Sequence, residues 1–193
     1  ATAGHQPDPG AAPALVLERL EEFTGSAAFA RWLAAPGRWI GGFDLPFGLP
    51  RELVETLGWP LQWEPLLRHV AALPRAELRT RLAAFCAARP AGSKFAHRAC
   101  DGPAGSSPSM KWVNPPVVYM LHTGVPLLLE AGVRLPGLHA GAGDQRIALE
   151  AYPGLLAREL IGRRSYKSDA KVDEAAAQAR HAARGELIDA LVA

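Results

Sequence analysis

The chain has 193 residues, of which 49% are hydrophobic and 21% are charged, a composition typical of a folded globular domain rather than a disordered chain. The 21 lysines and arginines against 19 aspartates and glutamates give a net charge of +2, which argues against a surface that coats polyanions over its whole extent. Two cysteines fit a reducing compartment, and no signal peptide or apolar stretch of roughly 18 residues is found, so we expect a single cytoplasmic domain over residues 1–193 with no membrane segment.

The first part of the chain predicts one clear helix. Residues 1–13 are rich in proline and glycine and are typical of a loop, whereas residues 14–23 fit either a half-exposed strand or a short helix. The next helix is expected to begin at an N-cap, Ser26, and to end at Pro36 and Gly37. Its apolar face consists of Phe29, Trp32 and Leu33.

A strand follows directly. Residues 38–45 (RWIGGFDL) predict a buried strand, in which Gly41 and Gly42 indicate that another backbone approaches closely. The strand ends at Asp44. Residues 45–50 (LPFGLP) are then expected to form a rigid turn, because two prolines fix φ there.

A helical block comes next. The pattern predicts a helix that ends before Gly58, a second helix over residues 61–73 and a third that begins near Pro74. The apolar face of the third helix consists of Leu78, Leu82, Phe85 and Cys86. Residues 90–116 are typical of a long loop, and a loop of that length inside a domain usually serves a function or moves.

The block ends with a helix over residues 117–133 that Gly124 and Pro126 are expected to interrupt. The fold class that follows is α/β, with residues 51–133 as a helical insertion between two strands.

The last part of the chain contains the second strand. Residues 146–152 alternate as a strand, Pro153 and Gly154 open a short helix, and Gly162 closes it. A long alanine-rich helix is expected from about residue 170 to the end, with Asp169 as its N-cap.

Two carboxylates leave the predicted strands just before proline-containing turns. They are Asp44 and Glu150. Ligands of open α/β sheets bind beyond the carboxyl ends of the strands, and converging carboxylates there are suited to Mg²⁺ or Mn²⁺. A pair of such ions would clamp the attacking and leaving oxygens of a phosphodiester. The alternative is structural: Asp44 caps the following turn and Glu150 pairs with an arginine.

Four segments together resemble a known family: WIGGFDLPFGLP, HRACD, PSMKWVNPPVVYMLH and ALEAYPGLLARELIGRRSYKSD. They are similar to the family called domain of unknown function 429, whose members are predicted ribonuclease H-like nucleases. The resemblance covers roughly residues 38–190. It implies a ribonuclease H-like fold, a mixed central sheet flanked by helices, with Asp44 at the end of the fourth strand and Glu150 near the end of the fifth.

The same resemblance implies two further acids. Family members begin with a strand that carries a G-x-D motif, whose aspartate would be the leading metal ligand, and no such strand precedes residue 14 here. The N-terminal strand is therefore expected to be absent from this chain. Members also tend to end in a helix with an Asp-Ala pair; either Asp189 and Ala190 are that pair here, or the chain stops short of it.

Basic residues near these motifs are candidate substrate contacts. Lys167 precedes a predicted helix N-terminus, where a phosphate would bind, or it is simply an exposed lysine before a capped helix. Arg98 and Asp101 form either a positioning ion pair at the rim of a site or, through Asp101, a further metal ligand; we favour the ion pair. Lys111 precedes Trp112, which either stacks on a base or anchors the loop to the core.

Two functions are consistent with these residues. The first is a divalent-metal-dependent nuclease or phosphodiesterase, with Asp44 and Glu150 as catalytic metal ligands, Asp101 as a further ligand, and Lys167, Arg98 and Lys111 as substrate contacts. The second is a non-catalytic ribonuclease H-like module that binds a nucleotide or a partner protein.

Overall fold

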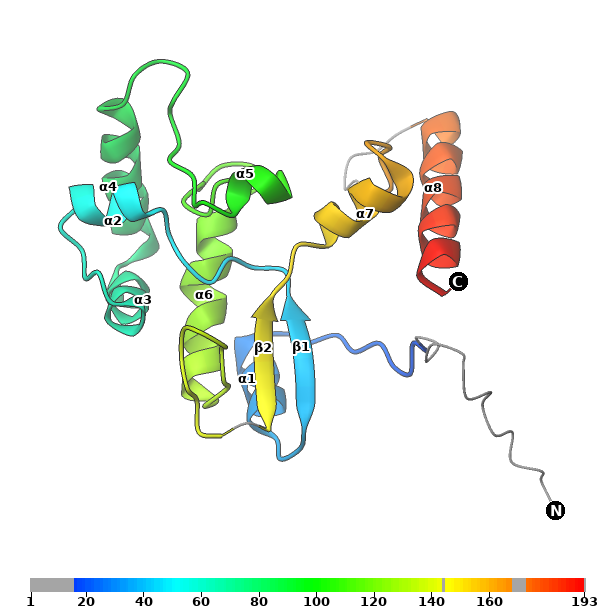
Figure 1. Ribbon diagram of the computed structural model, residues 1–193, viewed down its shortest axis with the longest axis horizontal. Coiled ribbons are helices and arrows are strands. Elements are labelled where there is room, and N and C mark those ends of the chain that lie inside the picture. Colours follow the sequence, from blue (N-terminus) through cyan, green and yellow to red (C-terminus); the bar gives the residue numbers. More distant parts are fainter. Residues whose placement is uncertain (1–15, 144, 168–172, 193) are drawn as a thin grey trace. The chain divides into compact units, whose positions relative to one another are not determined.

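The computed structural model describes residues 16–143, 145–167 and 173–192. The chain divides into two compact units, and Figure 1 shows the elements of each. The larger unit comprises Phe23–Leu155. The smaller unit comprises Ala1–Glu22 together with Leu156–Ala193.

The larger unit contains both strands and most of the helices. Its strands are β1 (Trp39–Phe43) and β2 (Arg146–Glu150). Its helices are α1 (Ser26–Ala34), α2 (Arg51–Thr56), α3 (Trp63–Ala72), α4 (Arg75–Ala87), α5 (Asp101–Ala104) and α6 (Val117–Glu130). The predicted helices of the 51–133 block are therefore confirmed as elements that lie between the two strands in the chain.

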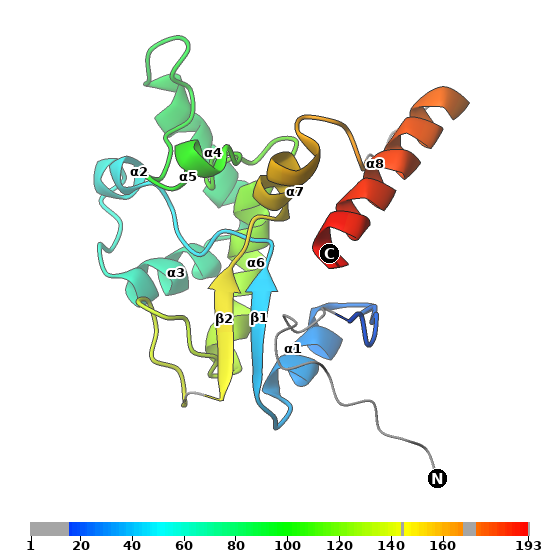
Figure 2. The ribbon, with the colours of Figure 1, turned by 45° about the vertical axis from the view of Figure 1, so that its right-hand side comes forward.

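The two strands pair in parallel, with Trp39 opposite Arg146 and Phe43 opposite Glu150. Parallel neighbours need a long crossover, and the helical block provides it. Both strands therefore end at the same edge of the sheet, as Figures 1 and 2 show. Within the described residues the sheet consists of these two parallel strands, so the α/β class is confirmed but the expected mixed ribonuclease H-like sheet is not seen there.

The prediction of a buried strand was wrong for β1, because one face of the strand is only half-buried and the other is exposed. Exposure alternates along the strand, and Ile40 is 72% exposed. On the opposite face Gly41 pairs with Ala148 of β2, which is fully buried. The side chains on that face pack toward the hydrophobic core.

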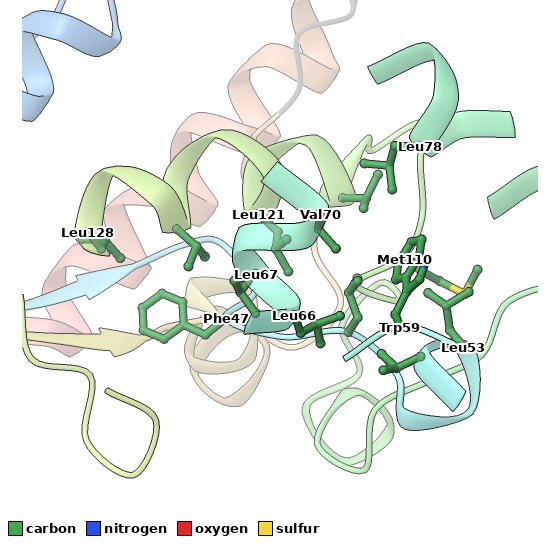
Figure 3. Packing of buried hydrophobic residues seen from close by; sticks show 14 of the residues in the cluster. Phe47, Leu53, Trp59, Leu66, Leu67, Val70, Leu78, Met110, Leu121 and Leu128 are labelled. Carbon is green, nitrogen blue, oxygen red and sulfur yellow. The ribbon is translucent and has the colours of Figure 1, made fainter. Parts of the chain in front are cut away.

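The core of the larger unit lies between α3, α6 and the turn at residues 45–50. Figure 3 shows Phe47 of this turn beside Leu67 of α3, with Leu128 of α6 close by. Leu121, Val70 and Leu66 continue the same packed cluster. Burying side chains of this size stabilises the fold by roughly 1.5–3 kcal/mol each relative to exposure.

Several expected details were wrong. The N-cap of α1 is Gly25, and Ser26 is already the first helical residue, with no side-chain capping bond. Residues 16–23 of the expected 14–23 element are neither helix nor strand, and residues 14 and 15 lie outside the described residues.

The helix α6 is continuous through Gly124 and Pro126, against the expected interruption. Leu45 explains why Gly124 is there: a Cβ at this position would lie 2.6 Å from Cδ2 of Leu45. The glycine lets the turn after β1 lie against the helix. Pro126 removes one backbone donor, but packing of Val125 and Leu128 in the core holds the helix together.

The smaller unit contains most of α7 (Pro153–Ile161) and all of α8 (Glu174–Val192). The expected cap Asp169 lies outside the described residues. Asp173 caps the N-terminus of α8, because its carboxylate accepts a 2.8 Å hydrogen bond from the N–H of Ala176. Among the described residues no helix is long and apolar enough to cross a membrane.

Candidate functional site

Glu150 ends β2 at the carboxyl edge of the sheet, and both of its carboxylate oxygens accept hydrogen bonds. Oε2 accepts a 2.9 Å hydrogen bond from the N–H of Phe47. Arg98 donates to both oxygens in a forked arrangement, from Nη1 to Oε2 at 2.8 Å and from Nη2 to Oε1 at 2.6 Å. Pairing with an arginine, the structural alternative for Glu150, is therefore confirmed.

Arg98 joins Glu150 to a second, deeper carboxylate. Its Nε donates to Oδ1 of Asp101 at 2.9 Å, and its backbone N–H donates to Oδ2 at 2.8 Å. The Asp101 side chain is fully buried and the Arg98 side chain is 14% exposed, whereas the Glu150 side chain is 33% exposed. The favoured ion pair between Arg98 and Asp101 is thus confirmed, and Asp101 is the buried partner of the guanidinium.

The carboxylates hold the charge on the arginine. Burial alone would lower the pKa of Arg98, but hydrogen bonds from the guanidinium to Glu150 and Asp101 outweigh burial and raise the pKa above its ordinary value. One positive charge lies between two negative ones. The carboxylate–arginine–carboxylate network therefore carries a net charge of about −1 when both acids are ionised.

Asp44 stands apart from this network. It is exposed just after β1, and in the described part of the chain no hydrogen bond or ion pair joins it to the Glu150–Arg98–Asp101 network. Its expected role as a turn cap is also not seen, since no backbone N–H of the described residues bonds to its carboxylate. No group of three or more histidine, cysteine or acidic side chains in the described ranges is arranged to hold a metal ion.

A cluster of aromatic and basic side chains lies on the loop that also carries Arg98. The Lys94 ammonium is 5.5 Å from the centre of the Phe95 ring and 5.7 Å from the centre of the Trp112 ring. The two rings meet edge to face, with centres 5.4 Å apart. We call residues 94–112 the aromatic–basic loop.

Both rings of this loop also contact the core. Phe95 and Trp112 are half-buried and pack against the hydrophobic cluster, so the anchoring role considered for Trp112 is confirmed. Lys111 is half-buried, and its carbonyl accepts a hydrogen bond from Val118 at the start of α6. Its role in substrate binding stays a prediction.

Lys167 belongs to the smaller unit. Its side chain is exposed, and its ammonium lies 5.6 Å from the centre of the Tyr166 ring. The residues between Lys167 and Asp173 lie outside the described ranges, so the expected placement of Lys167 at a helix N-terminus stays a prediction.

Sequence reasoning missed Lys94 and Phe95. Their only signal is adjacency in the segment GSKF within the long loop, which gives no indication that Trp112, seventeen residues later, completes the cluster. It also missed the backbone of Phe47, whose N–H bonds Glu150 and whose carbonyl accepts from the Trp63 indole at 2.5 Å. Backbone donors leave no mark in a sequence pattern.

Comparisons of the chain with family models, curated proteins and solved structures found no match. The resemblance to domain of unknown function 429 therefore stays a prediction.

Proposed function

We propose that this chain is a non-catalytic module that binds a nucleotide or a single strand of nucleic acid through the aromatic–basic loop. The observation that carries the proposal is the Lys94 ammonium beside the Phe95 and Trp112 rings. Aromatic faces stack on bases and a neighbouring lysine neutralises a phosphate, which is how proteins bind single strands without reading their sequence.

Lys94 is available for such a contact. Its side chain is exposed, and no carboxylate of the described residues lies within ion-pair distance of it. Its cation–π contacts hold the ammonium beside the two rings.

The occupied carboxylates support a binding role over catalysis. Glu150 accepts three hydrogen bonds and Asp101 is buried against Arg98, so each oxygen of both carboxylates already accepts a hydrogen bond from the protein. A two-metal site needs several carboxylates that converge on ions about 4 Å apart.

The test is a titration of fluorescently labelled single-stranded RNA and DNA, and of adenosine nucleotides, in EDTA at low salt. We expect the wild type to bind under these conditions, and Phe95→Leu and Lys94→Gln each to weaken binding at least roughly fivefold, as loss of one stacked base or one phosphate contact does. Arg79→Gln is the matched control, because Arg79 is an exposed cation of α4 that does not belong to this loop. No binding by the wild type, or equal binding by the Lys94→Gln variant, would overturn the proposal.

A metal-dependent nuclease is the second proposal, and the position of Asp44 favours it. Asp44 is exposed and follows β1 at the sheet edge where β2 ends in Glu150. Mg²⁺ or Mn²⁺ would require Glu150 to leave Arg98 and further acids from outside the described residues. Cleavage of RNA, DNA or a hybrid with either ion, abolished by Asp44→Asn, would support the nuclease and contradict a purely binding role.

A further inference from the structure

The larger unit contains a cavity at the amino ends of the two strands, the edge of the sheet opposite Glu150. Its volume is about 550 Å³. The walls come from the turn between α1 and β1, the end of α6 and the loop before β2, segments that Figure 1 shows below the strands. The polar lining side chains are those of Arg38, Gln145 and Arg146.

The parallel register brings these three side chains together. Trp39 pairs with Arg146, and the N–H of Trp39 donates to the carbonyl of Gln145 at 2.9 Å. Arg38 immediately precedes Trp39, so the strand pairing places its backbone next to Gln145. Two guanidinium groups therefore line one cavity although they are 108 positions apart in the chain.

The two arginines differ in their contacts with the rest of the protein. Nη1 of Arg146 donates to the carbonyl of Leu33 at 2.7 Å, which satisfies the carboxyl end of α1 and offsets the negative end of its dipole. The other guanidinium donors of Arg146 have no protein acceptor in the described ranges. Arg38 is exposed and has no ion pair there.

The remaining lining is small and uncharged. It consists of Ala34, Pro36, Gly37, Gly132, Ala142 and Gly143. A Cβ at Gly37 or at Gly143 would meet no atom within 4 Å, so the space beside these two glycines is open. No acidic side chain lines the cavity among the described residues.

We propose that this cavity binds a small metabolite that carries phosphate or carboxylate groups. Guanidinium groups present forked donors that match both oxyanions, and the strand register places two of them at one cavity. The volume lies within the roughly 300–1,000 Å³ of small-molecule sites, so the cavity has room for both the anionic group and the organic part of such a ligand. This site is independent of the aromatic–basic loop.

The test is isothermal titration calorimetry on the full chain with pyrophosphate and with citrate. Binding of pyrophosphate alone assigns the site to phosphate ligands, and binding of citrate alone assigns it to carboxylates. We expect at least one probe to bind, Arg38→Gln to weaken its Kd roughly tenfold or more, and Arg38→Lys to weaken it less, because lysine keeps the charge without the fork.

Two controls keep the test specific. Arg31→Gln removes an exposed arginine of α1 that does not line the cavity, and it should leave the Kd unchanged. Arg38→Gln should also leave binding of single-stranded RNA unchanged, which separates this site from the proposed function. The inference is overturned if neither probe binds, or if Arg38→Gln binds the probe as tightly as the wild type and Arg31→Gln do.

Discussion

Arg98 is the residue on which the carboxyl edge of the sheet depends most. It is the partner of a fully buried carboxylate, Asp101, and of Glu150, whose side chain is 33% exposed. Removing one member of a buried ion pair leaves an uncompensated charge in a low-dielectric environment. We therefore expect Arg98→Gln to lower the free energy of unfolding by about 3–5 kcal/mol, measured by urea denaturation at pH 7.

A double variant checks this cause. Asp101→Asn in the Arg98→Gln background removes the stranded charge, so it should restore part of the lost stability, whereas Glu150→Gln alone should cost less than Arg98→Gln because Glu150 reaches solvent. A loss below about 1 kcal/mol for Arg98→Gln would show that the pair behaves like an ordinary surface salt bridge.

The two cysteines should differ in reactivity. Cys86 packs in the core from α4, and burial raises the pKa of its thiol, although the charge of Lys94 opposes this shift. Cys100 is exposed at the start of α5. Because the thiolate is the reactive form, a thiol reagent at pH 8 should label Cys100 in the native protein and Cys86 only after denaturation. Fast native labelling of a Cys100→Ser variant would contradict the described core.

Glu64 should make the free energy of unfolding depend on pH in a way that one substitution can test. Hydrogen bonds from Arg68 chiefly, and the nearby His139, hold the pKa of the Glu64 carboxyl below its ordinary value of 4.5. A lowered pKa means that the stabilisation is present above pH 4.5 and is lost as the pH falls through the lowered value. Glu64→Gln should thus be less stable than wild type at pH 6, and the two urea midpoints should converge as the pH falls below 4.5 through the lowered pKa. A constant difference over this range would contradict the assignment.

At the scale of elements, periodicity predicted the helices well where one face is buried. The apolar faces expected for α1 and α4 supply buried residues such as Leu33 and Leu82. Local rules failed where a distant residue decides the outcome. Gly124 and Pro126 have the local properties of helix breakers, but tertiary packing of α6 overrides those preferences, and Leu45 from another part of the chain is what requires the glycine.

Two helical glycines offer a matched comparison. Replacing glycine by alanine in a helix interior usually stabilises a protein by about 0.5–1 kcal/mol. Gly185 of α8 has open space where a Cβ would be, so Gly185→Ala should show this gain in the thermal melting of α8. Gly124→Ala should show no gain or a loss, because Leu45 must move. Equal gains at both positions would mean that Leu45 does not pack closely on α6.

At the scale of the whole molecule, only the contacts between residues close together in the chain could be predicted from the sequence. The strand-end position of Glu150 and the ion pair of Arg98 with Asp101 were predictable, because acids after buried strands and closely spaced opposite charges are local signals. The pairing of Arg98 with Glu150 joins residues 52 positions apart, and Lys94 meets Trp112 across a loop, so both depended on the tertiary fold. The parallel register that brings Arg38 and Arg146 to one cavity also could not be predicted from local sequence patterns.

The salt dependence of binding tests the proposed nucleic-acid contact most directly. Each phosphate neutralised on a single strand contributes about −0.7 to the slope of the logarithm of the association constant against the logarithm of salt concentration. With labelled single-stranded RNA in EDTA, we predict that Lys94→Gln makes this slope shallower by about 0.7 relative to wild type, while Arg79→Gln leaves it unchanged. Identical slopes for all three proteins, or no binding by the wild type, would contradict the claim that the aromatic–basic loop binds a nucleic-acid strand.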